Sequence, residues 1–574
     1  MARCSRLARL VPVVFSLVAA ISCSRDTPAP QPAASGPVRG GALTVSIRSE
    51  PGTFNRFSPR GGNQGPVDAL TRVMHATLVH VNRVTGDVEP WLAEKWTASD
   101  DGRSYTLTLR DGVTFSDGKP FTSADVAFTF QALYDPAVDS PVASAVKVEG
   151  KPLQIATPDP RTVVITMPAP FAPGIALLDN VPILPKHQLQ AALDAHTFAE
   201  AWGTKTPPAE IAGLGPFTMA EYVPAQRITF VRNPRYFRKD ASGGALPYLD
   251  QLVLEFIAGG QDPEILRLES GAVDFMSQAD IRPEDIAALR RLQGQGALQL
   301  AEVGVSIDPN CLWFNLTPGA AAGKAKPYLL RPEFRRAISL AVDRAAIAST
   351  VYLGAAAPAY GPITPGNKTW YAASPRTEVH DPAQAKTLLN GLGLTDRNGD
   401  GMLDDWKGQP VKFSILVQRG TIRERTVTMV QEQLRQVGIG VDVVGMDVPS
   451  MFGRFGAGDY ESIYHGFQAS AFDPGMNLDF WLSGGSAHVW NTGAPAPWEQ
   501  ALDMVMKKQA AAGTLAERQQ LLREAERIFA ENLPQIYFVA PKVTVAMSRK
   551  VGGAVPVLLD PKILWNADAL FVKP

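Results

Sequence analysis

Cysteine is scarce in this chain, with only three among 574 residues. Three thiols cannot form a framework of several disulfides. The fold therefore has to be stabilised by a hydrophobic core. Cys311 lies in the apolar run CLWFNL at 311–316. We expect it to be a buried core thiol without a bridging partner.

An excess of charge of either sign is also missing. The 55 Lys and Arg residues face 56 Asp and Glu residues, which gives a formal net charge of -1. This balance argues against a nucleic-acid binder that is held by phosphate contacts. The apolar fraction of 45% excludes a largely disordered chain, and the length predicts two or three lobes. The 49 glycines and 47 prolines favour an irregular α/β fold over a helical bundle.

No segment after the first residues has about 18 consecutive apolar residues, so the sequence predicts no membrane-spanning helix there. The apolar run at 10–21 follows three arginines and is typical of a signal-peptide core. The sequence AISC at 20–23 is similar to a bacterial lipobox, which predicts a signal peptide at 1–22 and lipidation at Cys23. A flexible Pro/Ala/Ser-rich tether is expected at 23–39. The alternative is an ordinary cleaved signal with an incidental cysteine.

Catalytic motifs are absent as well. None of the seven histidines belongs to an HExxH motif or pairs with cysteines at zinc spacing. The chain contains no GxSxG elbow, P-loop or strand-linked GxGxxG. Each histidine is expected to be a surface or a satisfied core side chain. The sequence gives no positive sign of an enzyme, and we expect none.

One segment, at 396–405, matches the first half of a calcium loop. Oxygen ligands would come from positions 1, 3, 5 and 9, which are Asp396, Asn398, Asp400 and Asp404. Position 12, where a bidentate carboxylate belongs, is Lys407. We therefore favour a turn rich in Asn, Asp and Gly before a strand, with a weak calcium site as the alternative and no other cofactor.

The hydrophobic pattern predicts a mixed α/β protein. The expected strands are 41–47, 227–234, 248–257, 411–417, 439–446 and 536–547. The expected helices begin near 123, 334, 382, 421 and 515, and the second of them runs to 352. The Asp-Gly pairs at 101–102, 111–112 and 117–118 predict hairpin turns. The strand, helix and strand between 411 and 446 predict a parallel pair.

The segment TGDVEPWLAEKWTASDDGRSYTLTLRDGVTFSDGKPFTSADV, at 85–126, closely resembles the family 5 extracellular solute-binding proteins. These are the dipeptide, oligopeptide and nickel receptors of ABC importers. Further matching segments follow in the family's order, at 213–217, 232–236, 334–344 and 472–474. The resemblance covers about 40–574. These motifs have structural reasons; for example, Gly213 and Gly215 permit backbone geometry that residues with a side chain cannot adopt. The motifs therefore identify the fold and say little about the ligand.

The resemblance implies a two-lobed periplasmic binding protein fold of the cluster C type with an extra inserted subdomain. Lobe I would comprise 40–73, 190–312 and 534–574, with the inserted subdomain at 74–189. Lobe II would comprise 313–533. Two chain crossings, near 312 and 533, would form a hinge, and the lobes would close on a ligand between them.

The resemblance also implies where the ligand lies. Peptide-binding members hold the peptide's amine with an aspartate, and the matching position is Ser470, whose hydroxyl cannot supply a charge-assisted bond. Other charged or tyrosine positions of the family correspond to Tyr464 and Val142. The implied ligand-binding residues are Asn63, Val142, Tyr464, Phe467, Gln468, Ser470 and Asp473. Aromatic residues could add stacking surface: Tyr360, Trp370, Tyr371, Phe467, Trp481 and Trp490. We therefore expect a pocket less charged than that of a typical dipeptide receptor.

The resemblance as a whole predicts a lipid-anchored substrate-binding protein of an ABC importer, in the periplasm or cell envelope. It would carry peptides to a permease and its ATPase, act as a monomer and bind no nucleic acid. One alternative is the same fold binding a non-peptide solute such as an oligosaccharide, or serving as a sensor without a transporter. Others are a hydrolase acting in the cleft and a structural surface lipoprotein.

Overall fold

The computed structural model describes residues 36–61, 64–276, 281–319, 326–372, 379–466, 472–559 and 561–574. The signal peptide predicted at 1–22 and the lipidation site Cys23 lie outside these ranges. Residues 37–574 form one compact unit. Within the described ranges, no helix has the length and apolar character needed to cross a membrane.

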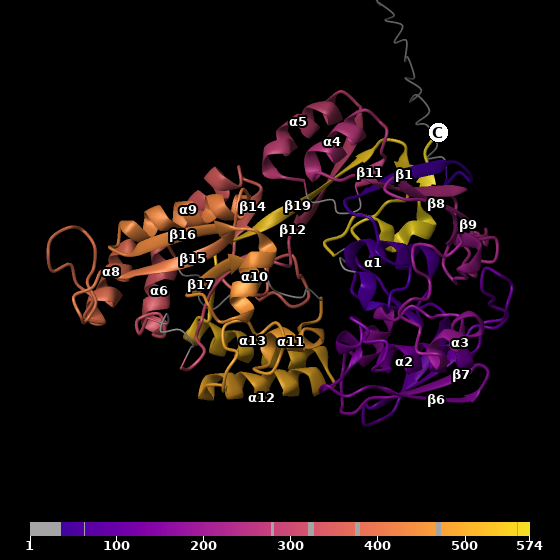
Figure 1. Cartoon of the computed structure of the whole chain (residues 1–574), viewed down its shortest axis with the longest axis horizontal. Coiled ribbons are helices and arrows are strands. Elements are labelled where there is room, and N and C mark those ends of the chain that lie inside the picture. The colour runs from indigo at the N-terminus through magenta and orange to yellow at the C-terminus, as the bar shows by residue number, and fades with distance from the viewer. Residues whose placement is uncertain are drawn as a thin grey trace, which may run out of the picture. The chain divides into compact units, whose positions relative to one another are not determined.

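The first of two large sheets has eight strands, in the order β12-β19-β11-β1-β10-β9-β8, with β14 paired to β19 (Figure 1). Its strands are β1 (Ala42–Ile47), β8 (Phe217–Val223), β9 (Arg227–Arg232), β10 (Gln251–Phe256), β11 (Phe275–Met276), β12 (Leu298–Val305), β14 (Ala356–Pro358) and β19 (Val539–Ser548). Strand β1 lies parallel to both β10 and β11, whereas β12 and β19 are antiparallel. The sheet thus joins segments that are far apart in the sequence.

The second large sheet has five strands, in the order β16-β15-β17-β13-β18. They are β13 (Cys311–Phe314), β15 (Lys412–Gln418), β16 (Gly440–Met446), β17 (Ser462–His465) and β18 (Gln535–Tyr537). Helix α9 (Ile422–Arg435) connects β15 to β16, and the two strands are parallel. The predicted strand–helix–strand unit is therefore confirmed. Cys311 is 3% exposed and unbridged in this sheet, as predicted.

A third, four-stranded sheet lies within 74–189, in the order β4-β5-β7-β6. Its strands are β4 (Ala93–Ala98), β5 (Ser104–Leu109), β6 (Gln154–Asp159) and β7 (Thr162–Thr166). Helix α2 (Ser123–Tyr134) begins with a capping box, in which the Asp125 carboxylate accepts a hydrogen bond from the backbone N–H of Thr122 at 2.9 Å. The sequence predicted this helix start correctly.

The chain passes between the two large sheets several times. It leaves the first sheet after β12 and enters the second at β13, and it returns between β18 and β19 at Phe538. The single strand predicted over 536–547 is therefore two strands in different sheets. A further passage is made at β14, which follows β13 of the second sheet in the sequence and pairs with β19 of the first.

The remaining elements are helices and short strands at the sheet faces and edges. They are α1 (Gln64–Met74), α3 (Lys186–Asp194), α4 (Gln261–Glu269), α5 (Pro283–Gly294), α6 (Pro332–Ala341), α7 (Arg344–Ala346), α8 (Pro382–Gly391), α10 (Val448–Gly456), α11 (Leu478–Trp481), α12 (Pro497–Ala511), α13 (Leu515–Asn532), β2 (Val79–Val81), β3 (Val88–Pro90), β20 (Val551–Gly552) and β21 (Phe571–Val572), with short 3-10 turns that include η1 (Pro59–Gly61), η3 (Gly174–Asn180) and η7 (Leu564–Ala569).

Two local predictions were wrong. The helix expected over 334–352 breaks at Val342, because the Asp343 side chain caps a new turn by accepting a hydrogen bond from the backbone N–H of Ala346. This break lets the buried Arg344 guanidinium donate to the backbone oxygen of Tyr537 at 2.9 Å. The Asp-Gly pair at 111–112 forms a turn but no hairpin, because β5 pairs with β4 and β7.

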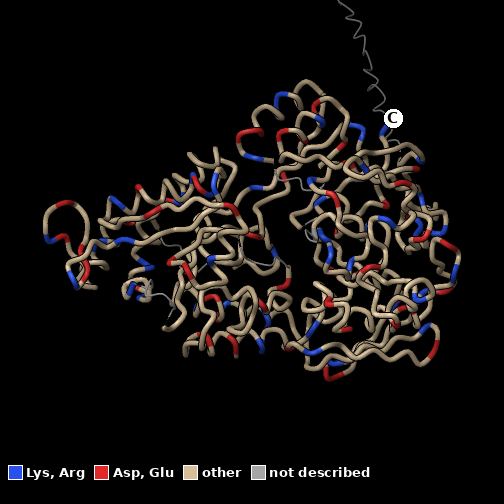
Figure 2. The backbone as a smooth tube through the Cα atoms, viewed as in Figure 1, with Lys and Arg blue, Asp and Glu red and all other residues tan. Residues whose placement is uncertain are grey.

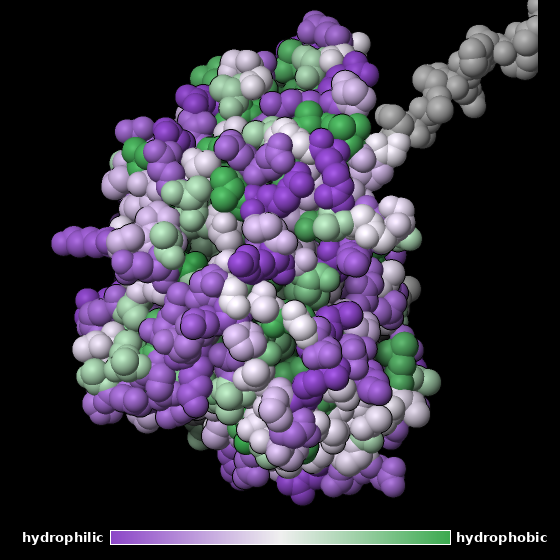
Figure 3. Space-filling model, turned by 90° about the vertical axis from the view of Figure 1, so that its right-hand side faces the viewer, coloured by the Kyte–Doolittle hydropathy of each residue, from purple (hydrophilic) through white to green (hydrophobic). Residues whose placement is uncertain are grey.

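Along the described part of the chain, acidic and basic residues are interspersed (Figure 2). In the space-filling view, apolar groups form small scattered patches on a largely hydrophilic face (Figure 3). The balanced composition is thus distributed evenly, and the positions that matter for binding have to be sought in cavities.

Candidate functional site

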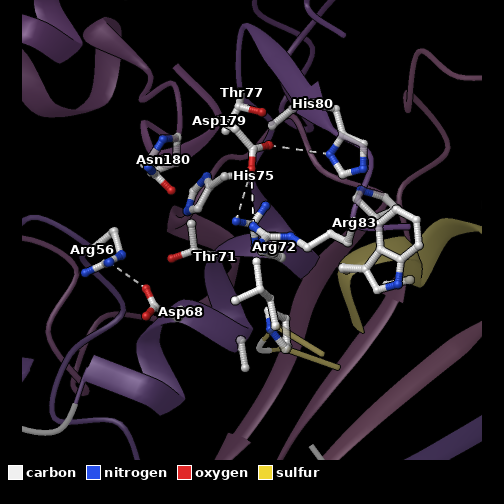
Figure 4. A pocket seen from close by; sticks show the side chains of 18 of the residues that line it. Arg56, Asp68, Thr71, Arg72, His75, Thr77, His80, Arg83, Asp179 and Asn180 are labelled. Atoms are coloured by element: carbon white, nitrogen blue, oxygen red, sulfur yellow. Dashed lines mark hydrogen bonds and ion pairs between the residues drawn. The ribbon is translucent and has the colours of Figure 1, made fainter. Parts of the chain in front are cut away.

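A cavity of about 560 Å³ opens beside helix α1 (Figure 4). Its wall is formed by α1, the segment that leads into β2, the end of η3 and the C-terminal turn η7. A volume of this size is typical of sites for small ligands. Asp308, in the crossing between β12 and β13, also lines the cavity.

Helix α1 presents a polar face to this cavity. Asp68, Thr71, Arg72 and His75 are spaced three or four residues apart, which places them on one side of the helix. His75 continues the last turn, since its backbone N–H donates to the backbone oxygen of Thr71 at 2.9 Å. This spacing was visible in the sequence and could have signalled the site.

Asp179 joins the cations of the cavity into one cluster. The residue is 4% exposed, and its carboxylate lies 3.4 Å from Arg72, 3.2 Å from Arg83 and 3.6 Å from His80. The backbone N–H of Val81 donates to it at 3.2 Å. Burial alone would raise the pKa of this carboxyl, but the arginines and His80 lower it to about 2. Asp179 is therefore a permanent buried anion that holds two arginines at the cavity wall.

Arg56 approaches the same wall from the segment before η1. One of its terminal nitrogens lies 2.6 Å from the Asp68 carboxylate, and its side chain is 17% exposed. Burial and the nearby Arg72 both lower the pKa of Arg56, while Asp68 raises it. Two partly buried guanidinium groups thus lie within electrostatic range of one another.

His75 lies at the base of this region and is 6% exposed. Its ring stacks on Trp202 with centroids 5.6 Å apart. Burial lowers the pKa of His75 to about 4, so the imidazole is neutral at pH 7. Its Nδ1 atom is buried without a hydrogen-bond partner among the described residues.

Two glycines fix the position of His75. A Cβ atom on Gly213 would lie 2.0 Å from the backbone oxygen of Met74, and one on Gly215 would lie 2.4 Å from the Met74 carbonyl carbon. The backbone N–H of Gly215 donates to that Met74 oxygen at 2.8 Å. Neither glycine has a positive φ, so the expected need for a special backbone conformation is not what requires glycine here. A side chain is excluded instead by close contact with the end of α1.

The other side of the cavity is aromatic. The His80 ring stacks between Trp91, at 4.3 Å, and Trp565, at 5.7 Å between centroids. Arg238 lies 4.0 Å from the centre of the Trp91 ring and also pairs with Asp568. The cavity can therefore offer a ligand both charged groups and flat apolar surface.

The residues implied by the resemblance are placed elsewhere or are not described. Tyr464, in β17, is 0% exposed and stacks on Phe538, and Val142 is 4% exposed in the core around α2. The Asp473 carboxylate accepts from Arg518 at 2.7 Å and from the backbone N–H of Gly475 at 2.9 Å. The positions outside the described residues are Asn63, Phe467, Gln468 and Ser470. Their assignment to ligand binding stays a prediction.

The aromatic residues considered for stacking divide in a similar way. Trp370, Trp481 and Trp490 are buried in one core cluster around β13, α12 and α13. Tyr371 is 39% exposed, and together with Tyr360 it lines a small second cavity. The cavity beside α1 contains several charged side chains and none of these aromatic residues. The expectation of a pocket less charged than that of a typical dipeptide receptor concerns the residues implied by the resemblance, and it stays a prediction.

The segment at 396–405 folds as a network of turns. The Asp396 carboxylate accepts from the backbone N–H groups of Gly399 and Gly401 at 2.7 and 2.9 Å. Asp400 accepts from Met402, and Asp404 accepts from Arg397. Among the described residues, no group of three or more His, Cys, Asp and Glu side chains is arranged to hold a metal ion. Calcium binding by this loop stays a prediction.

The second cavity contains a carboxylate with a raised pKa. Glu526 of α13 lines it beside Tyr360 and Gln535. Burial raises the pKa of Glu526 to about 8, although Arg523 opposes this. Glu526 therefore binds its proton more tightly when folded than when unfolded, where its pKa is near 4.5. The carboxyl is protonated in the folded protein at neutral pH.

Glu526→Gln is expected to raise the melting temperature above that of the wild type at pH 8, and to leave it nearly unchanged at pH 5. The reason is that the wild type loses stability as pH rises between the unfolded and folded pKa of Glu526, and glutamine removes this loss. Thermal unfolding of both proteins at both pH values measures the difference in melting temperature. Glu524→Gln, at an exposed position of the same helix, is the control. A difference that is independent of pH would contradict the raised pKa.

Comparisons with known proteins agree on one group. The family model for "Bacterial extracellular solute-binding proteins, family 5 Middle" matches residues 87–488. The chain is 26% identical over 551 residues to a probable ABC transporter-binding protein of Deinococcus radiodurans, covering 90% of each chain. It is 26% identical to the di/tripeptide-binding protein 2 of Pseudomonas aeruginosa, covering 89% of this chain and 94% of that protein.

A solved structure is similar over nearly the whole chain. It is the oligopeptide-binding protein AppA of Bacillus subtilis in complex with a nonapeptide. The TM-score is 0.70 with 23% sequence identity, and the match covers 94% of this chain and 100% of that one. This likeness confirms the predicted two-lobed α/β fold.

Proposed function

Because the chain belongs to the bacterial extracellular solute-binding proteins of family 5, we propose that it captures peptides and delivers them to an ABC permease. The name of the Pseudomonas aeruginosa relative, a di/tripeptide-binding protein, supports a peptide as the solute. The balanced net charge and the fold are compatible with a carrier of this kind.

The observation that carries the proposal is the cavity beside α1. Its volume of about 560 Å³ suits a ligand of a few residues. Its wall combines guanidinium groups, carboxylates, a neutral imidazole and indole rings. A peptide offers matching groups, since it has charged ends, backbone donors and acceptors, and side chains that can stack. The cavity is therefore proposed as the part of the ligand site that the first sheet and the inserted segment supply.

The finer features of the function are part of the same proposal. The protein would be a monomer anchored to the cell envelope through lipid at Cys23, with a permease and an ATPase as partners. It would release its ligand unchanged and need no cofactor. A weak calcium site at 396–405 is the alternative to a plain turn in that loop, and a non-peptide solute is the alternative ligand.

The test is native mass spectrometry of the exported chain, purified without denaturation as a Cys23→Ser variant that cannot be lipidated. We expect a series of adducts whose masses correspond to peptides, because a peptide carrier accepts many sequences. Extraction of the ligands and fragmentation would identify them. A single adduct that does not fragment as a peptide would refute the peptide assignment and leave the family assignment unchanged.

A further inference from the structure

We propose that Trp565 is a specificity residue of the cavity beside α1, and that the ligand packs an aromatic side chain against its indole ring. The protein would therefore prefer peptides that contain an aromatic residue over peptides of small residues. This inference rests on the proposed function, because it names the class of peptide that the same cavity takes.

A stack of flat side chains forms one side of the cavity and ends at Trp565. The guanidinium group of Arg238 lies 4.0 Å from the centre of the Trp91 ring. The His80 ring lies nearly parallel to Trp91, at 25°, and to Trp565, at 5°. In Figure 4, His80 is on the side of the cavity opposite Arg56. Among the rings of the described residues, the indole of Trp565 stacks with His80 alone, so its second face has no ring partner.

The indole of Trp565 lies at the cavity wall and outside the packed core. Trp91 packs against the main hydrophobic core, whereas Trp565 belongs to none of the core clusters in the described ranges. Trp565 is half-buried and lines the cavity together with Leu559 and Pro561 of the same C-terminal segment. An aromatic side chain packed there would remove apolar surface of both partners from water.

The orientation of this indole is fixed before a ligand binds. Its Nε1–H donates to the backbone oxygen of Val555 at 2.7 Å. On either side of it in the sequence, Leu564 is buried, and the Asn566 side-chain amide donates to the backbone oxygen of Gly553 at 3.0 Å. A ring that is already held in place loses little conformational freedom on binding. Trp565 therefore offers a rigid flat surface to the ligand.

The charged side chains in and beside the cavity wall are paired with one another. The ion pairs are Arg56–Asp68, Arg72–Asp179, Arg83–Asp179 and Arg238–Asp568. Asp308 also has interactions of its own. Burial lowers the pKa of His75 to about 4, so its ring is neutral at pH 7. A ligand recognised through a charge would compete with one of these pairs, whereas a ring that packs on the indole displaces none of them.

The test is isothermal titration calorimetry of the full chain, as the Cys23→Ser variant, with synthetic tripeptides. They are trialanine and the three peptides in which one alanine is replaced by phenylalanine. We expect at least one of these three to bind about tenfold or more tightly than trialanine, which is the range for burying a phenylalanine side chain. The best of them is then compared with its cyclohexylalanine analogue, which has a similar size but no aromatic ring. The analogue should bind about twofold or more weakly.

A pair of variants connects the preference to Trp565. Trp565→Ala removes the flat surface and should reduce the preference for phenylalanine over alanine to less than about threefold. Trp406→Ala is the matched control and should keep the full preference. Trp406 is 47% exposed, its Nε1–H also donates to a backbone oxygen, that of Leu392 at 2.8 Å, and it does not line the cavity. The peptide series on the unsubstituted site decides the inference even if Trp565→Ala does not fold.

The outcomes separate the inference from the proposed function. Peptides that bind without preferring phenylalanine at any position would overturn the aromatic preference, and peptides would remain the ligands. Full retention of the preference in Trp565→Ala, or equal affinity for the cyclohexylalanine analogue, would also overturn it. If none of the peptides binds and the purified protein contains no peptide, the proposed function itself fails.

Discussion

Asp179→Asn should lower the free energy of unfolding by about 3 kcal/mol or more, because it removes the anion that compensates two partly buried arginines. The substitution keeps the shape of the side chain, so the loss reports on charge. The guanidinium groups of Arg72 and Arg83 lie 3.4 and 3.2 Å from the Asp179 carboxylate. In the variant they would contact a neutral amide instead. Urea unfolding at pH 7, followed by tryptophan fluorescence, measures the change.

The difference in the free energy of unfolding between Asp179→Asn and the wild type should depend on pH. The folded pKa of Asp179 is about 2, below its usual 3.8, so its stabilising contribution is complete above about pH 4 and is lost as pH falls toward 2. The two proteins should therefore converge in stability at low pH. Asp194→Asn, on the surface of α3, is the control and should have little effect at any pH. A constant difference down to pH 2 would contradict the ion cluster.

Gly213→Ala should destabilise the protein by more than about 3 kcal/mol and weaken ligand binding at the same time. The new Cβ would have to displace the backbone at Met74, which is directly followed by His75. Backbone atoms cannot move aside as a flexible side chain can, so the end of α1 must shift. Thermal unfolding and titration with the peptides that co-purify with the wild type measure the two effects.

The matched control is Gly453→Ala, in the interior of α10. Apart from its chain neighbours and the backbone of its own helix, no atom of the described residues lies within 4 Å of the position where its Cβ would be. Alanine should therefore stabilise the helix by about 0.5–1 kcal/mol. If Gly213→Ala proved as harmless as this control, the close approach between the glycine turn and α1 would be wrong. If it lost stability but kept full affinity, the end of α1 would not belong to the ligand site.

Much of the fold could be predicted because its signals are local. Thr122 with Asp125, and Asp381 before Pro382, mark helix starts by chemistry that needs no distant partner, and both helices are present. The parallel pairing of β15 with β16 was also predicted, from the strand–helix–strand pattern of hydrophobic residues alone. The helix break at Val342 could not be predicted, because the contact that it allows, from Arg344 to the backbone oxygen of Tyr537, joins residues 193 positions apart.

Much less of the candidate site could be predicted from the sequence. Arg56, Arg72, Arg83 and Asp179 come from four separate segments, and only the fold brings them together. Asp179 follows the apolar residues ALL at 176–178, where nothing in the sequence indicates an ion cluster. Four of the seven residues implied by the resemblance lie outside the described part of the chain: Asn63, Phe467, Gln468 and Ser470. The helical spacing from Asp68 to His75 was the one local signal that pointed to the cavity.

The order of strands in the first sheet has a consequence for how the chain is made. Strand β1 has its partners at 251–256 and 275–276, and β11 is bordered in turn by β19, which ends at Ser548. A ribosome has to synthesise nearly the entire chain before this sheet can close. Folding that depends on contacts so distant in sequence is slow. The first sheet is thus expected to remain incomplete throughout synthesis, a state in which this part of a nascent protein can be threaded through a translocation pore.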